Sequence, residues 1–179
     1  AELIAGPFRS IINAATMLAQ SKNIHQAEID AACEYIDFLK FNAAFMQEIY
    51  ANQPKNEKGV WNRLSYRPLE GFVYAVSPFN FTAIAGNLCA SVAMMGNTVV
   101  WKPSDHQVFS ANILMQVFRE AGLPDGGINM VFGALETITN TVLESLDVAG
   151  IHYIVAPEVY SNMWSTLVKN IDVYRSYER

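Results

Sequence analysis

Residues 72–81 read FVYAVSPFNF, a continuous apolar run followed by a turn that carries the amide of Asn80. Val and aromatic residues are favoured in β-strands, and a run without polar alternation is typical of a strand buried on both faces. Further apolar runs occupy 98–101, 128–132 and 151–155. The sequence therefore predicts four short, buried strands.

A helical pattern follows each predicted strand. The helices are expected at 83–95, 107–121, 136–145 and 158–169. Gly or Asn residues that accept left-handed geometry end the first two helices, and Pro157 stands in the first turn of the last. Alternating strands and helices form parallel sheets with helices on both faces, joined by right-handed crossovers. We expect an α/β fold of this kind.

The chain before the first strand is predicted to be helical. We expect a helical segment with its linker at 1–60 and a Rossmann-like cofactor-binding domain at 61–179, separated by the polar stretch 54–63. Asn23, with Gln26 three residues later, is typical of a capping box that starts a second helix, which should run to about residue 50 and be covered on most sides. The residues expected on the apolar faces are Phe8, Ile11, Ile12, Ala15, Leu18, Ile29, Cys33, Ile36, Ala43 and Met46, with Tyr35, Phe38, Phe45 and Ile49 on the flank of the second helix.

The composition is that of a globular protein and limits the expected partners. Of the 179 residues 51% are hydrophobic, and the formal net charge is −5 at pH 7. Because Lys and Arg form no run, nucleic acid and anionic membranes are not expected as partners, and no apolar stretch has the length of a membrane span. Cys33 and Cys89 lack metal-ligand spacing, so we expect reduced core thiols in the cytoplasm, or in the mitochondrial matrix of a eukaryote.

Ligands of such sheets bind beyond the carboxyl ends of the strands, where this sequence places several polar side chains. Asn80 follows the first strand, and Lys102, Ser104 and Asp105 follow the second. Each has an ordinary structural interpretation. Asn80 suits a turn, Lys102 could extend from a buried stem to water, and Ser104 or Asp105 could cap the next helix. Glu34, on a polar stripe of the second helix, would then simply be solvated.

Several common site motifs are absent from the sequence. It has no G-x-G-x-x-G dinucleotide fingerprint, no G-x-x-x-x-G-K-[ST] phosphate loop and no G-x-S-x-G nucleophile elbow. His25, His106 and His152 have neither metal-ligand nor triad spacing. We expect His106 and His152 to be structural.

The loops after the first two strands resemble those of the aldehyde dehydrogenase superfamily. SPFNF at 77–81 and WKPS at 101–104 match that family's pair of strand-end loops, with an intervening helix of matching length. The similarity is greater to the branch of 1-pyrroline-5-carboxylate dehydrogenases. It is carried by QAEIDAACEYIDFLKFN, YRPLEGFVYAVSPFNFTAIAGNL, GNTVVWKPSD and FREAGLPDGGIN, at 26–42, 66–88, 96–105 and 118–129.

The resemblance implies a fold and a reaction. The family's fold has an NAD-binding α/β domain, a catalytic domain and a β-flap for oligomerisation, so we expect a homo-oligomer or a partner subunit. The family's reaction oxidises the small aldehyde L-glutamate γ-semialdehyde, the open form of pyrroline-5-carboxylate, to glutamate in proline breakdown. A Cys thiolate attacks the aldehyde, hydride passes to NAD⁺, and a Glu assists hydrolysis of the thioester. Asn80 would stabilise the oxyanion through its side chain.

The same resemblance implies roles for the other strand-end residues. Ser77 and Phe79 would line the cofactor, and Lys102 would reach the adenosine ribose. Glu34 matches an acidic residue near the nicotinamide end of the family's site. The remaining cofactor-loop positions that match the family are Ser104 and Asp105.

Two departures from the family pattern bear on activity. The family's nucleophilic Cys and its Glu lie beyond the last residue of this chain, and neither Cys33 nor Cys89 matches the nucleophile position. The family also has FTGS where this chain reads YIVA at 153–156. Val155 and Ala156 then replace the Gly and Ser that would approach the pyrophosphate, and Glu158 adds a negative charge. The sequence therefore predicts weak NAD⁺ affinity.

Three hypotheses follow from these observations. The first is a portion of a pyrroline-5-carboxylate dehydrogenase that contains the helical lead-in and much of the cofactor domain. The second is a degenerate, non-catalytic domain with a structural or subunit-binding role, which the YIVA departure favours. The third is a non-catalytic nucleotide-binding module.

Overall fold

The computed structural model describes residues 1–172 and contains a parallel sheet of four strands. The strands are β1 (Phe72–Val76), β2 (Thr98–Lys102), β3 (Ile128–Met130) and β4 (Val148–Tyr153). Their order is β3-β2-β1-β4, and every pairing is parallel. The predicted α/β fold is confirmed.

The fourth strand differs from its predicted position. It begins at Val148 rather than at Ile151, and its pairing with β1 shifts register between Phe72 and Val73. The small residues Ala149 and Gly150 fill this added length. Because Gly is depleted in strands, the sequence pattern concealed the first half of β4.

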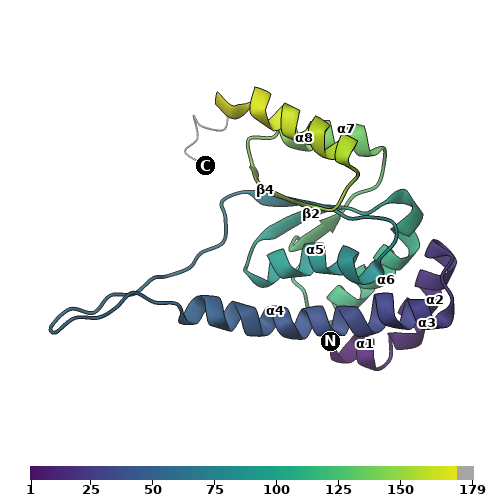
Figure 1. The fold of residues 1–179 in the computed structure, drawn as a ribbon, viewed down its shortest axis with the longest axis horizontal. Helices are drawn as coiled ribbons and strands as arrows, with labels where there is room; N and C mark the ends of the chain where they lie inside the picture. Colours follow the sequence, from purple (N-terminus) through teal and green to yellow (C-terminus); the bar gives the residue numbers. More distant parts are fainter. Residues whose placement is uncertain (173–179) are drawn as a thin grey trace.

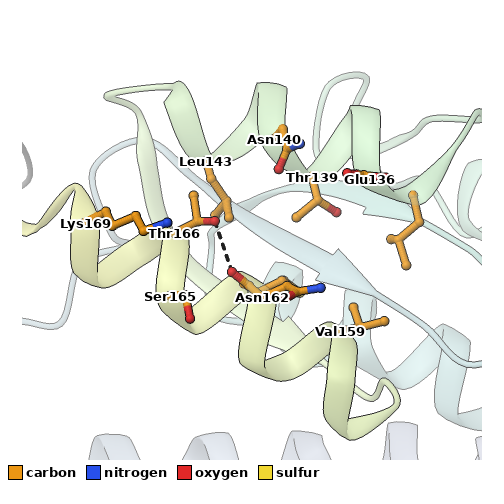
Figure 2. Close-up of a pocket in the computed structure, with 11 residues that line it drawn as sticks. Glu136, Thr139, Asn140, Leu143, Val159, Asn162, Ser165, Thr166 and Lys169 are labelled. Carbon is orange, nitrogen blue, oxygen red and sulfur yellow. Dashed lines mark hydrogen bonds between the residues drawn. The ribbon is translucent and has the colours of Figure 1, made fainter.

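Helices cover both faces of the sheet (Figure 1). One face carries α5 (Thr82–Met94) and α6 (Val108–Glu120), and the other carries α7 (Leu135–Glu144) and α8 (Pro157–Lys169). On the second face, Tyr74 and Val76 of β1 form an apolar cluster with Val142 of α7 and Met163 of α8. A groove of about 550 Å³ runs between α7 and α8, with Leu143 at its wall and Asn140, Asn162 and Lys169 at its rim (Figure 2).

The residues before β1 form the predicted helical segment, with one unexpected element. Its helices are α1 (Glu2–Ala5), α2 (Arg9–Gln20), α3 (Ile24–Ala27) and α4 (Glu34–Ala51), and a π-helix at Glu28–Cys33 joins α3 to α4. The capping box of Asn23 and Gln26 is confirmed, because each side chain bonds the other residue's backbone N–H. The π-helix inserts extra residues into the turn, so side chains after it rotate relative to a regular helix.

Part of the predicted core is wrong. Ile29 is 61% exposed, and the second helix is not covered on most sides, since Phe45 and Ile49 face outward. Ile11 and Leu18 of α2 are also exposed, whereas the polar residue Thr16 of the same helix is buried. The burial of Thr16 has a local reason, because its hydroxyl bonds the hydroxyl of Thr82 at 2.8 Å.

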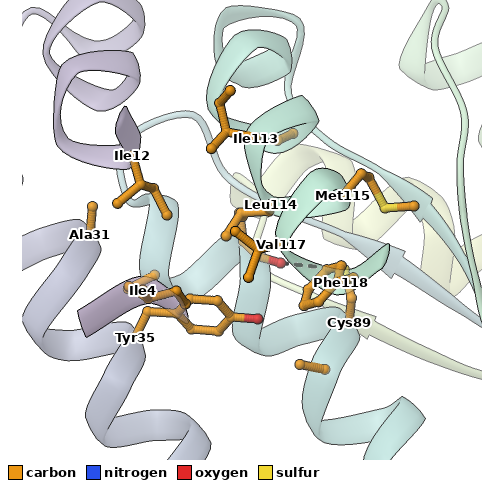
Figure 3. Close-up of a cluster of buried hydrophobic side chains, with 14 of the residues drawn as sticks. Ile4, Ile12, Ala31, Tyr35, Cys89, Ile113, Leu114, Met115, Val117 and Phe118 are labelled. Atoms are coloured by element: carbon orange, nitrogen blue, oxygen red, sulfur yellow. Dashed lines mark hydrogen bonds between the residues drawn. The ribbon is translucent and has the colours of Figure 1, made fainter. Parts of the chain in front are cut away.

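The helical segment and the sheet domain share one apolar cluster (Figure 3). Ile4, Ile12 and Tyr35 from the helical segment pack with Cys89 of α5 and Leu114 of α6, and all five are buried. Cys89 is thus a core thiol, as predicted, whereas Cys33 is only partly buried. The division of the chain at residue 60 stays a prediction.

An extended arm at 52–71 separates α4 from β1 (Figure 1). Every residue of the arm is exposed, and an isolated antiparallel bridge between Glu57 and Val60 closes its tip. The arm includes the apolar side chains Val60, Trp61, Leu64, Tyr66 and Leu69. Among residues 1–172 no helix is both long and apolar enough to cross a membrane.

Candidate functional site

A cavity of about 390 Å³ lies at the carboxyl edge of the sheet. Its walls come from the loops after β1, β2 and β4, which a parallel sheet brings to one edge. The lining residues are Val76, Ser77, Pro78, Phe79, Lys102, Pro103, Ser104, Asp105, His106, Leu135, Ile154, Val155, Ala156 and Val159. The structure therefore gathers all five of the residues assigned to cofactor binding, while Asn80 and Glu34 lie outside this lining.

Ser77 is fixed in the wall of this cavity by the second strand. Its hydroxyl accepts a hydrogen bond from the indole N–H of Trp101 at 3.0 Å and donates to Gln107 at 3.5 Å. Its backbone N–H donates to the carbonyl of Lys102 at 3.3 Å. These bonds to Trp101, Gln107 and Lys102 fix the position of Ser77 and of the loop that begins with it.

Lys102 does not extend into water, which corrects the simplest structural interpretation. The residue is only 3% exposed, and its ammonium donates to the carbonyl of Pro103 at 2.8 Å and to the carboxylate of Asp105 at 2.7 Å. That hydrogen bond, with the attraction of the positive charge, lowers the pKa of Asp105. A buried cation is thus held at the cavity with an exposed counter-ion.

The predicted helix cap at this loop is also wrong in detail. A 3₁₀ turn, Asp105–Gln107, precedes α6, and Ser104 stands before it without a side-chain capping bond. Asp105 is committed to Lys102 instead. His106 faces the ring of Phe79 edge-on, with ring centroids 6.5 Å apart, and His152 contacts the carbonyl of Leu88, so both histidines make structural contacts.

Asn80 lies in the exposed loop between β1 and α5, and its backbone carbonyl is held by a residue that the sequence did not indicate. Lys22, from the turn after α2, donates a hydrogen bond to that carbonyl and pairs with Asp30 at 2.6 Å. The same ammonium lies 4.1 Å from the ring centroid of Phe81. Lys22 is 58 residues from Asn80 in sequence, so only the tertiary structure brings them together.

Glu34 is not the solvated residue that its polar stripe predicted. It is partly buried, and one of its carboxylate oxygens is inaccessible and has no hydrogen-bond partner among residues 1–172. Burial raises the pKa of Glu34, the negative charge of Asp30 raises it further, and Lys22 opposes both effects. The charged form of Glu34 is therefore destabilised by its surroundings.

The raised pKa of Glu34 predicts that its contribution to the stability of the fold depends on pH. Because the folded pKa is raised above the unfolded one, Glu34 contributes stability at low pH that is lost as the pH rises through the folded pKa. We expect Glu34→Gln to raise the melting temperature at pH 7 by up to about 3 °C and to leave it unchanged near pH 3. Thermal unfolding at both pH values checks this, with the exposed residue Glu48→Gln as control. Equal effects at the two pH values would contradict the prediction.

The loop after β4 carries the departures seen in the sequence. The N–H of Ile154 donates to the carbonyl of Val76 at 3.1 Å, which holds the loop against β1. Val155 and Ala156 line the cavity, and Ala156 precedes α8 without a side-chain capping bond. Pro157 opens that helix, as predicted, and Glu158 lies exposed in its first turn. This part of the cavity wall therefore presents the apolar residues Ile154, Val155 and Ala156, and Glu158 lies outside the lining.

Comparisons with known proteins agree on one family. Residues 4–172 match the model of the aldehyde dehydrogenase family. A "probable delta-1-pyrroline-5-carboxylate dehydrogenase" of Schizosaccharomyces pombe is 50% identical over 182 residues, which cover 100% of this chain and 33% of the relative. The mitochondrial delta-1-pyrroline-5-carboxylate dehydrogenase of Bos taurus is 43% identical over 100% of this chain and 32% of its own length.

A solved structure has the same fold. The Mycobacterium tuberculosis delta-pyrroline-5-carboxylate dehydrogenase bound with NAD superimposes with a TM-score of 0.95 at 50% identity, covering 98% of this chain and 33% of that one. The chain thus spans about a third of the length of the relatives it matches. On the family match and these identities, the chain belongs to the aldehyde dehydrogenase family.

Proposed function

We propose that this chain is part of an NAD⁺-dependent enzyme that oxidises L-glutamate γ-semialdehyde to glutamate in proline catabolism. The observation that supports it most is the cavity at the carboxyl edge, which brings Ser77, Phe79, Lys102, Ser104 and Asp105 together. The M. tuberculosis relative, whose structure is described as bound with NAD, has the same fold over this region at 50% identity. The 50% identity to relatives named delta-1-pyrroline-5-carboxylate dehydrogenase supports the same substrate class.

The cavity fits the adenosine part of a dinucleotide. It is walled mainly by apolar groups, as sites for a nucleoside commonly are, with one buried cation among them. The Lys102 ammonium bonds the carbonyl of Pro103 and the carboxylate of Asp105, so one of its three N–H donors is left for a ribose hydroxyl. When bound, NAD⁺ supplies the hydride acceptor of the reaction.

Asn80 supplies the oxyanion donor in this proposal. Its side chain is a neutral N–H donor on an exposed loop, and its backbone is fixed by Lys22. Such a donor stabilises the negative charge that develops when a thiolate attacks an aldehyde. Glu34, with its raised pKa, would lie near the nicotinamide end.

Neither cysteine of this chain suits the nucleophile's role. Burial raises the pKa of Cys89 well above its ordinary value, and burial with the negative charge of Glu28 raises that of Cys33. The thiolate is the reactive form, so both thiols are held in the unreactive state at neutral pH. The proposal therefore assigns the nucleophile to a residue outside this sequence.

Turnover of the aldehyde tests the proposal directly. The polypeptide that contains this chain is incubated with NAD⁺ and pyrroline-5-carboxylate, and NADH formation is followed by its absorbance. We expect NADH and glutamate in equal amounts. Tight NAD⁺ binding without turnover would favour a nucleotide-binding module, and neither binding nor turnover would favour a structural domain.

The loop after β4 makes a separate prediction about the cofactor. We expect the double variant Val155→Gly, Ala156→Ser to bind NAD⁺ about tenfold more tightly, because it removes a branched side chain and adds a hydroxyl facing the cavity. Calorimetry on wild type and variant measures the change. The matched control is Val60→Gly, Ala51→Ser, which alters the same residue types at exposed positions far from the cavity. An equal gain in the control, or none in the double variant, would contradict this account of the loop.

Compartment and assembly belong to the same proposal. The relatives from Bos taurus and Emericella nidulans are named mitochondrial, which supports the matrix if the source is a eukaryote. The exposed apolar side chains of the arm, Val60, Trp61 and Leu64 among them, support a homo-oligomer or a partner subunit.

A further inference from the structure

The loop that carries Asn80 is held from two directions. From the sheet, Trp101 of β2 bonds Ser77. From the helical segment, the amide of Gln20 and the hydroxyl of Thr16 both bond the hydroxyl of Thr82, at 2.7 and 2.8 Å. These contacts fix the two ends of the loop, and none of them touches its middle.

Lys22 contacts the backbone in the middle of the loop. Its side chain is 13% exposed, and its ammonium contacts the Asn80 carbonyl, the Asp30 carboxylate and the face of the Phe81 ring. Ser21 lies directly after α2 and has a left-handed backbone with φ of 54°. The turn at Ser21 brings Lys22 next to the loop that carries Asn80. A residue with a side chain adopts the left-handed conformation at an energetic cost, so the surrounding contacts must hold the turn in place.

Asp30 in turn holds Lys22. It stands in the π-helix, and its carboxylate lies 2.6 Å from the Lys22 ammonium with its own side chain only 21% exposed. A long flexible ammonium held by a carboxylate, a carbonyl and an aromatic face loses its freedom to move away. The ion pair of Lys22 and Asp30 therefore holds the backbone carbonyl of Asn80 in a fixed position.

We propose that Lys22, supported by Asp30, is a positioning residue for the Asn80 side chain. The argument rests on the proposed function, in which Asn80 is the oxyanion donor. An oxyanion donor stabilises the transition state only when it is held rigidly, and small displacements are costly. Fixing the Asn80 carbonyl fixes the peptide plane and Cα from which its side chain extends. Lys22 acts only through Asn80 and touches no reacting atom.

Kinetics of matched variants distinguish a role of Lys22 in positioning Asn80 from a role in only attaching α2 to α5. In the polypeptide that contains this chain, Lys22→Met is expected to lower kcat roughly 10- to 100-fold, with KM for NAD⁺ within about twofold of wild type. Gln20→Met is the control, because it removes one bond to Thr82, whose hydroxyl is still held by Thr16, and leaves the contact to Asn80 intact. We expect its kcat to stay within about twofold, and Lys22→Arg to recover part of the loss.

A spectroscopic readout makes the test independent of turnover. In Lys22→Met the side-chain NH₂ resonances of Asn80, assigned by comparison with Asn80→Ala, should shift or broaden, whereas in Gln20→Met they should stay in place. If Lys22→Met fails to fold because Asp30 is left unpaired, Lys22→Met combined with Asp30→Asn replaces it and should show the same changes.

The outcomes distinguish this inference from the proposed function. The positioning role is overturned if Lys22→Met and Gln20→Met lose kcat equally, or if Lys22→Met leaves kcat unchanged. In either case, turnover by the wild type still supports the proposed function. If wild type shows no turnover, the function fails. The Asn80 resonances then decide alone whether Lys22 holds that side chain.

Discussion

Replacing Asn80 with Ala is expected to lower kcat for glutamate semialdehyde oxidation by about 10²- to 10³-fold, the usual cost of losing one oxyanion donor. The physical reason is that the donor acts on charge present in the transition state and absent from the bound aldehyde. KM for NAD⁺ should change little, because Asn80 is not among the residues that line the cofactor cavity. Steady-state kinetics of the polypeptide that contains this chain measure both quantities.

Two further variants sharpen this prediction. Asn80→Asp keeps the shape of the side chain but places a negative charge beside the developing oxyanion, so its kcat should fall at least as far as that of Asn80→Ala. Asn140→Ala, an exposed amide on α7, is the control and should retain wild-type kcat. Since Asn80 is exposed, all three variants should keep the wild-type melting temperature within about 2 °C. An active Asn80→Ala enzyme would remove Asn80 from the mechanism.

The sheet could be predicted from the sequence because its strands carry their own signal. Phe72–Val76 and Thr98–Lys102 are continuous runs of residues that favour strands, and each is followed by a helix with a recognisable end. The first half of β4 gave no such signal, because Ala149 and Gly150 have little propensity for strands. Periodicity alone likewise could not reveal the π-helix, Glu28–Cys33, in which Ile29 is exposed.

The site was predictable only where it depended on strand ends. Ser77 follows β1 and Lys102 is the last residue of β2, so a parallel sheet necessarily brings them to one edge. Lys22 and Asp30 reach Asn80 from a separate helical segment, and nothing within their local sequence distinguishes them from solvated charges. The pairing of Lys102 with Asp105 was also missed, because a residue at a helix start is more often a cap than a counter-ion.

Substituting Gly86 with Ala is expected to destabilise the protein by about 2–3 kcal/mol, although Gly to Ala in a helix interior normally stabilises by about 1 kcal/mol. Gly86 lies within α5, where a Cβ would stand 2.5 Å from Cζ of Tyr35 and 2.9 Å from two neighbouring ring carbons. The Tyr35 ring is fully buried in the cluster that joins α4 to α5, so it cannot turn aside without opening the core. Urea unfolding at constant m-value measures the change.

A double-mutant cycle isolates this contact. In a Tyr35→Leu background the three ring carbons nearest to the added methyl of Gly86→Ala are absent, so the substitution should recover most of its ordinary helix-stabilising effect. The coupling between the two substitutions should exceed about 1 kcal/mol, as expected for residues in direct contact. A coupling near zero would mean that the ring does not set the approach of α4 to α5. Since α5 begins two residues after Asn80, that approach also determines where the loop of the candidate site meets the helical segment.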